Sequence, residues 1–104
     1  ANLSGGQQKL LELGRALMTD PDMILLDEPV AGVNPTLAKK VFERIIELRN
    51  SLDKTFLVVE HNMDIVMNFC DRIGVMHRGQ LVAEGTPKEI ARNEQVLQIY
   101  LGMA

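Results

Sequence analysis

The chain has 104 residues, enough for at most one ordinary domain, and its 46% apolar and 24% charged residues are typical of a globular protein that buries a core. A formal net charge of -3 gives no indication of a nucleic-acid partner, and no apolar run approaches the roughly 18 to 20 residues that span a bilayer. The single cysteine, Cys70, excludes an internal disulfide and suits a reducing compartment, and we interpret it as a small core residue.

Helices and short apolar strands alternate along the first part of the chain. Apolar residues at helical spacing predict a helix over residues 5–19, and turn residues follow it. The run 23–26 is entirely apolar, as expected of a strand that is buried on both faces of a parallel sheet. Asn34 followed by proline predicts the start of a helix over 35–52, and residues 55–59 predict a second buried strand.

The second part of the chain carries further helix and strand signals. Asn62 is a candidate cap of a third helix, and Thr86 with Glu89 has the sequence of a capping box. His77 falls in a turn between two predicted strands, where we expect it to be exposed. The predicted elements are a helix ending at residue 69, strands over 72–76 and 81–84, and helices opening at residue 87 and covering 95–101.

This alternation favours an α/β fold with a mainly parallel sheet and a C-terminal β-hairpin. In such sheets ligands bind beyond the carboxyl ends of the strands, so the residues that follow each predicted strand are candidates for a site.

Asp27 and Glu28 directly follow the first apolar strand. Adjacent acids are costly to bury unless a cation pairs with them, and Mg²⁺ accepts one or two carboxylates together with waters and phosphate oxygens. Because successive strand side chains point in opposite directions, one acid could hold metal-bound water while the other orients an attacking water. The alternative is a solvated acidic turn.

Glu60 and His61 hold the same position after the second strand. A histidine at this place is able to donate a hydrogen bond to a phosphate oxygen. The alternative is a histidine that caps or packs.

Ser4, Gly5, Gly6 and Gln7 open the first helix. Ser4 and Gln7 fit a capping box, which is a sufficient structural explanation for both. Two glycines in the first turn weaken a helix, however, and we expect them to let a ligand approach the backbone N–H groups. The partial positive charge of a helix N-terminus then predicts an anion surface that suits phosphate.

Taken together, three motifs in one order resemble the ATP-binding cassette (ABC) ATPases. The sequence LSGGQ at 3–7 resembles the signature motif, LLDEP at 25–29 the Walker B motif, and His61 after a buried strand the H-loop. Residues 31–35 would form the D-loop. The resemblance covers essentially all 104 residues and implies a partial P-loop NTPase-type three-layer fold.

The resemblance also implies catalytic roles for Glu28 and His61 and a metal-binding role for Asp27. Asp27 would act through Mg²⁺ and its waters, Glu28 would be the general base of ATP hydrolysis, and His61 would contact the γ-phosphate.

Other residues would act across an assembly. Ser4, Gly5, Gly6 and Gln7 would bind ATP held by a second cassette in a head-to-tail dimer, and Asn34 would lie at the D-loop interface. The implied partners are that second ABC ATPase subunit, transmembrane permease subunits and, indirectly, a periplasmic or surface solute-binding protein. The implied location is the cytoplasmic face of the membrane, as a peripheral subunit.

Within the family, AGVNP at 31–35, VEHNMD at 59–64 and EGTP at 84–87 resemble the ATPases of branched-chain amino acid importers. ATPases of urea import and of lipopolysaccharide export share parts of these sequences and are alternatives. Two departures are Asn34, where many cassettes have Asp, and Gly14, where the family usually has Ala and where helix stability is expected to fall slightly.

The sequence contains no G-x-x-x-x-G-K-[ST] P-loop. We therefore expect residues 1–104 to be the C-terminal part of one ABC ATPase domain whose P-loop and Q-loop lie upstream, and we expect this piece alone to be inactive. In the family the P-loop strand lies between the strands predicted here at 55–59 and 72–76, so its absence leaves two unpaired edges and predicts low stability.

Two further hypotheses are a DNA-repair or chromosome-maintenance ATPase of the same superfamily and a non-enzymatic remnant. The former usually carry long coiled coils, and no heptad run is present here.

Overall fold

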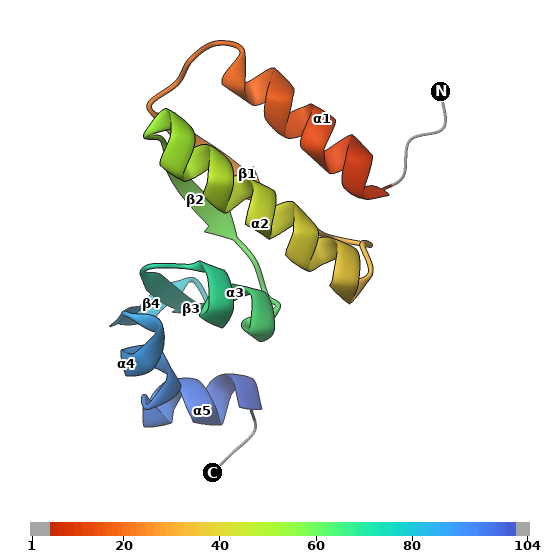
Figure 1. The fold of residues 1–104 in the computed structure, drawn as a ribbon. Coiled ribbons are helices and arrows are strands. Elements are labelled where there is room, and N and C mark those ends of the chain that lie inside the picture. The colour runs from red at the N-terminus through yellow and green to blue at the C-terminus, as the bar shows by residue number, and fades with distance from the viewer. Residues whose placement is uncertain (1–4, 102–104) are drawn as a thin grey trace. The chain divides into compact units, whose positions relative to one another are not determined.

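The computed structural model describes residues 5–101 (Figure 1). The chain divides between Ile65 and Val66 into two compact units, and the short helix α3 (Met63–Phe69) contains the division. We describe the two units separately and call them the N-terminal unit and the C-terminal unit.

The N-terminal unit is a two-stranded parallel sheet with two helices. Strands β1 (Met23–Asp27) and β2 (Thr55–Val59) pair in parallel, with Leu25 opposite Leu57. Helix α2 (Pro35–Leu52) lies along one face of this sheet, and α1 (Gly5–Leu17) runs beside α2 (Figure 1). The buried apolar residues of this unit are Leu13, Ile24, Val30, Ala38, Val41, Phe42, Ile45 and Ile65.

Helix α2 begins and ends with side-chain and backbone caps. The Asn34 side chain accepts a hydrogen bond from the Leu37 N–H at 2.9 Å, and Pro35 occupies the first helical turn. Asp53, in the left-handed conformation at φ 53°, closes the last turn by donating its N–H to the Arg49 carbonyl. The predicted start and length of this helix are confirmed.

The prediction that the first strand is buried on both faces is wrong for the described residues. Exposure alternates along the strand, and on the uncovered face Leu25 is 69% exposed and Leu57 is 51% exposed. The physical reason is that α2 covers one face of the sheet and nothing within residues 5–65 covers these side chains.

The C-terminal unit is built on an antiparallel hairpin. Strands β3 (Ile73–His77) and β4 (Gln80–Gly85) are joined by Arg78 and Gly79, both with positive φ, as in the two-residue turns that match strand twist. His77 is therefore the last residue of β3, pairs with Gln80 and is half-buried, whereas the sequence predicted an exposed turn residue.

Two short helices complete the C-terminal unit, α4 (Pro87–Ala91) and α5 (Glu94–Leu101). The capping box predicted at Thr86 and Glu89 is confirmed, with both reciprocal hydrogen bonds formed. The Tyr100 hydroxyl donates to the Met76 carbonyl and ties α5 to β3. The core consists of Ile73, Val75, Ile90 and Val96, with Val66, Met67, Cys70, Val82 and Ala83 packed against it.

Cys70 is half-buried against this core, as predicted. Burial, with a smaller contribution from the Asp71 charge, raises the pKa of the Cys70 thiol, which keeps it protonated.

The fold class predicted from the sequence is confirmed as mixed α/β, with one parallel strand pair and one antiparallel hairpin. Within residues 5–101, none of the helices combines the length and the apolar character that crossing a membrane requires.

Candidate functional site

The parallel pairing of β1 and β2 brings the two polar strand ends to one edge of the sheet. Asp27 is the last residue of β1 and lies opposite Val59, the last residue of β2. Glu28 follows the first strand, and Glu60 and His61 follow the second. The structure thus brings together residues that the sequence could place only at the ends of separate strands.

Glu28 sits in a sharp turn. Its φ is 46°, in the left-handed region that non-glycine residues rarely adopt and that costs about 1 kcal/mol or more. Two hydrogen bonds hold the turn: the Glu28 N–H donates to the Val59 carbonyl at 2.8 Å, and the Ala31 N–H donates to the Glu28 carbonyl at 3.1 Å. The backbone of β2 therefore fixes the point from which the Glu28 side chain projects.

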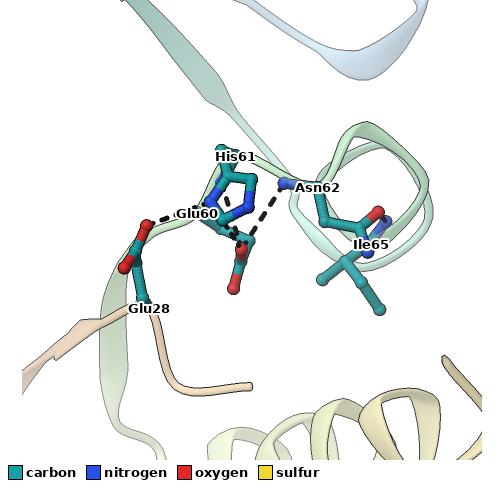
Figure 2. Close-up of polar contacts among 5 residues, drawn as sticks. All are labelled: Glu28, Glu60, His61, Asn62 and Ile65. Carbon is teal, nitrogen blue, oxygen red and sulfur yellow. Dashed lines mark hydrogen bonds and ion pairs between the residues drawn. The ribbon is translucent and has the colours of Figure 1, made fainter. Parts of the chain in front are cut away.

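The Glu28 carboxylate meets the ring of His61 (Figure 2). Glu28 Oε1 lies 3.0 Å from His61 Nδ1, across 33 positions of sequence. Because an ionised carboxylate only accepts hydrogen bonds, Nδ1 carries the proton and donates it, which leaves Nε2 for a further contact.

Both side chains of this pair remain accessible. The His61 side chain is 76% exposed and that of Glu28 is 49% exposed. A polar contact between side chains this exposed is worth at most about 1 kcal/mol, so an incoming ligand can separate the pair at small cost. This exposure would allow the Glu28 carboxylate to release His61 and accept a hydrogen bond from a water molecule.

Glu60 is a residue to which sequence reasoning assigned no role. Its side chain is only 3% exposed, and Oε1 accepts the backbone N–H groups of His61 at 3.0 Å and Asn62 at 3.4 Å. The one signal available in the sequence was an acid placed directly after a buried strand. Asn62 caps α3 as predicted, since its Oδ1 accepts the Ile65 N–H at 3.3 Å.

Asp27 is exposed at the end of β1 and borders a cavity of about 260 Å³ between α1, β1 and α2. No cluster of three metal-ligating side chains exists among residues 5–101. One exposed carboxylate nevertheless fits Mg²⁺, which keeps several waters and binds through one or two carboxylates plus phosphate oxygens.

The opening helix reveals a packing reason for one of its glycines. Ser4 lies outside the described residues, and α1 begins at Gly5. Gly6 is buried, and a Cβ placed there would lie 2.7 Å from the side chain of Leu37 on α2. The sequence predicts that both glycines let a ligand approach; the structure shows that Gly6 also lets α1 lie close to α2. Asn34 also has a structural role, because its side chain caps α2.

Comparisons with known proteins agree with this geometry. A family model described as ABC transporter matches residues 1–31, and one described as branched-chain amino acid ATP-binding cassette transporter matches residues 80–102. A solved nucleotide-free ATP-binding cassette from an ABC transporter is 47% identical and superposes with a TM-score of 0.85 over 98% of this chain and 42% of its own. This chain belongs to the ABC transporter ATP-binding family.

Two curated relatives of this ABC cassette chain are named for branched-chain amino acid transport. The probable branched-chain amino acid transport ATP-binding protein LivG of Methanocaldococcus jannaschii is 50% identical over 104 residues, covering 96% of this chain and 40% of its own length. The high-affinity branched-chain amino acid transport ATP-binding protein LivG of Salmonella typhimurium is 46% identical over 104 residues, covering 100% of this chain and 41% of its own length. The chain thus spans about two fifths of the length of these relatives.

Proposed function

We propose that this cassette chain is part of the ATP-hydrolysing subunit of an ABC transporter that imports branched-chain amino acids. The observation that carries the proposal is the Glu28–His61 pair, held at 3.0 Å at the carboxyl ends of two paired parallel strands. The 46–50% identity to LivG proteins supports the branch.

In this proposal Glu28 is the general base. Its accessible carboxylate, fixed by the turn that β2 holds, orients and deprotonates the water that attacks the γ-phosphate of ATP. His61 donates Nδ1–H to Glu28 and turns its exposed ring toward the γ-phosphate. Asp27 would hold Mg²⁺ through water, and the ion would neutralise part of the phosphate charge.

The opening of α1 acts on a second cassette. ATP held by that partner binds to Ser4, Gly5, Gly6 and Gln7, with Asn34 near the same interface. Support comes from the partial positive charge that a helix N-terminus presents to phosphate.

The whole subunit would then work at the cytoplasmic face of the membrane. Both units of the chain belong, in this proposal, to one ATPase domain that pairs with a second cassette and with permease subunits. A solute-binding protein would deliver the amino acid to the permease.

The test uses the full-length protein with its permease in vesicles. We expect ATP-dependent uptake of leucine, and Glu28→Gln is expected to retain ATP while halting hydrolysis and uptake. Hydrolysis of ATP without uptake of any branched-chain amino acid would reject the substrate and leave the ATPase. Hydrolysis by Glu28→Gln at the wild-type rate would remove Glu28 as the base.

The 104-residue chain alone is proposed not to hydrolyse ATP, because its sequence contains no P-loop lysine to contact the β- and γ-phosphates. Steady turnover by the purified chain, lost in Glu28→Gln, would contradict this.

A further inference from the structure

Glu60 holds a carboxylate where water does not reach it. Its side chain is 3% exposed, and burying a carboxylate is costly unless hydrogen bonds compensate. Oε1 is compensated twice, by the backbone N–H groups of His61 and Asn62, while Oε2 is buried without a hydrogen-bond partner among the described residues. Figure 2 shows the carboxylate folded back onto the two residues that follow it.

These two N–H groups belong to the connection between β2 and α3. β2 ends at Val59 and α3 begins at Met63, so neither the sheet nor the helix supplies an acceptor for them. Glu60 supplies that acceptor on one side, and Asn62 fixes the other side by capping α3. The backbone of His61 is therefore held between two local anchors.

Glu60 also acts on the imidazole ring. Oε1 lies 3.7 Å from His61 Nδ1, the atom that Glu28 Oε1 contacts at 3.0 Å. Two carboxylates on one side of the ring favour a proton at Nδ1 and orient the opposite edge of the ring outward. Backbone and ring are thus constrained by the same buried group.

We propose that Glu60 is a positioning residue that sets the orientation of His61 for ATP hydrolysis. The inference rests on the proposed function of the chain as part of an ABC ATPase. Glu60 touches neither the nucleotide nor the attacking water, and its effect passes through His61.

A mutant cycle in the full-length protein tests this. Glu60→Leu removes the acceptor at similar size, and we expect kcat for ATP to fall about 10- to 100-fold, with KM for ATP nearly unchanged. In a His61→Ala background the same substitution should cause no further loss. Glu60→Gln keeps an oxygen acceptor and should restore most of kcat.

Val58→Ala provides the matched control. Val58 lies in β2, two positions before Glu60, and its side chain is partly buried. Because that side chain is apolar, it cannot accept a hydrogen bond from either N–H group. Its substitution loosens packing, so any effect should add to that of His61→Ala. If Glu60→Leu does not fold, Glu60→Asp, which is one methylene too short to reach both N–H groups, takes its place in the cycle. Additive losses in the Glu60 cycle, or wild-type kcat in Glu60→Leu, would overturn the proposal.

A second measurement is independent of activity. Amide hydrogen exchange of nucleotide-free, full-length protein should be faster at His61 and Asn62 in Glu60→Leu than in the wild type, and unchanged in Glu60→Gln. Unchanged exchange in Glu60→Leu would overturn the proposed anchoring. If the exchange result is as expected but the wild-type protein does not hydrolyse ATP, the proposed function is overturned and the anchoring of the His61 loop stands.

Discussion

The two units of the chain differ in how completely they cover their strands. In the C-terminal unit, Ile90 on α4 and Val96 on α5 are almost fully buried in a core with Ile73 and Val75 of the hairpin. In the N-terminal unit, α2 covers one face of the β1–β2 sheet, while Leu25 and Leu57 remain exposed on the other. The Glu28–His61 pair lies at the end of this half-covered sheet, so the candidate site and the closed core lie in different units.

The largest expected effect comes from the chemistry of the N-terminal unit. In the full-length protein, Glu28→Gln should lower kcat for ATP about 100- to 10,000-fold, because an amide cannot accept the proton from water. Glu84→Gln, at an exposed carboxylate 3.8 Å from Arg72 in the C-terminal unit, is the matched control and should stay near wild type. Steady-state phosphate release measures both. Equal losses of kcat in the two variants would contradict the assignment of the catalytic base to the N-terminal unit.

The next largest effect concerns the closed core of the C-terminal unit. Ile90→Ala should destabilise that unit by about 2 to 5 kcal/mol, because Ile90 is 1% exposed and its removal leaves a cavity. Hydrogen exchange in the full-length protein should show faster exchange at β3 and β4 in this variant. Leu25→Ala is the counterpart in the exposed sheet face, and its exchange profile should match that of the parent chain. Faster exchange throughout β1 and β2 in Leu25→Ala would show that the exposed Leu25 side chain stabilises the sheet.

Within the N-terminal unit, substitutions at two glycines of α1 should change stability in opposite directions. Gly6→Ala should destabilise the full-length protein by about 1 to 3 kcal/mol, because its methyl group would overlap the side chain of Leu37. Gly14→Ala should instead stabilise it by about 0.5 to 1 kcal/mol, since a Cβ there meets nothing within 4 Å and alanine favours the helix. Thermal denaturation measures the change in stability in each variant, and the two changes should have opposite signs. A stabilising Gly6→Ala would remove the packing explanation of that glycine.

The smallest expected effect is at the capping box of the C-terminal unit. Thr86→Ala should cost about 1 kcal/mol, because the Glu89 N–H at the start of α4 loses its acceptor. The Thr86 backbone N–H, hydrogen-bonded to the Glu89 carboxylate, holds the pKa of that carboxyl below its ordinary value.

The pH dependence of this cap follows from the lowered pKa. Stability contributed by Glu89 is present above the ordinary carboxyl pKa and is lost as the pH falls through the lowered one. Denaturation from pH 7 into the acid range should therefore show less acid loss in Glu89→Gln than in the wild type. A parallel decline in both would contradict the linkage.

Most local structure could be predicted from sequence, because its causes are local. Asn34 with proline, Asn62, and Thr86 with Glu89 are caps formed within three residues, and all three are formed as predicted. The ends of the elements moved by one or two residues, for example from 19 to 17 in α1, because the last turn depends on neighbours as well as on periodicity.

The candidate site could be predicted only in part. The placement of Glu28 and His61 beyond strand ends followed from the parallel-sheet rule, and the structure adds their direct contact across 33 positions. The catalytic roles of these residues, and the action of Ser4 to Gln7 on a partner, remain predictions. Glu60 was missed because its function depends on burial, which no local pattern reveals.

The sequence by itself determined the helices, the strands, their caps and the motif order, since side-chain periodicity and short-range hydrogen bonding suffice for these. Only the tertiary structure decided that Gly6 makes room for Leu37 and that the Glu60 carboxylate is buried against its own loop. It also shows that residues 5–65 leave one face of the β1–β2 sheet uncovered. Each of these depends on which surfaces meet in space. Such contacts join segments whose separation along the chain carries no signal of their proximity.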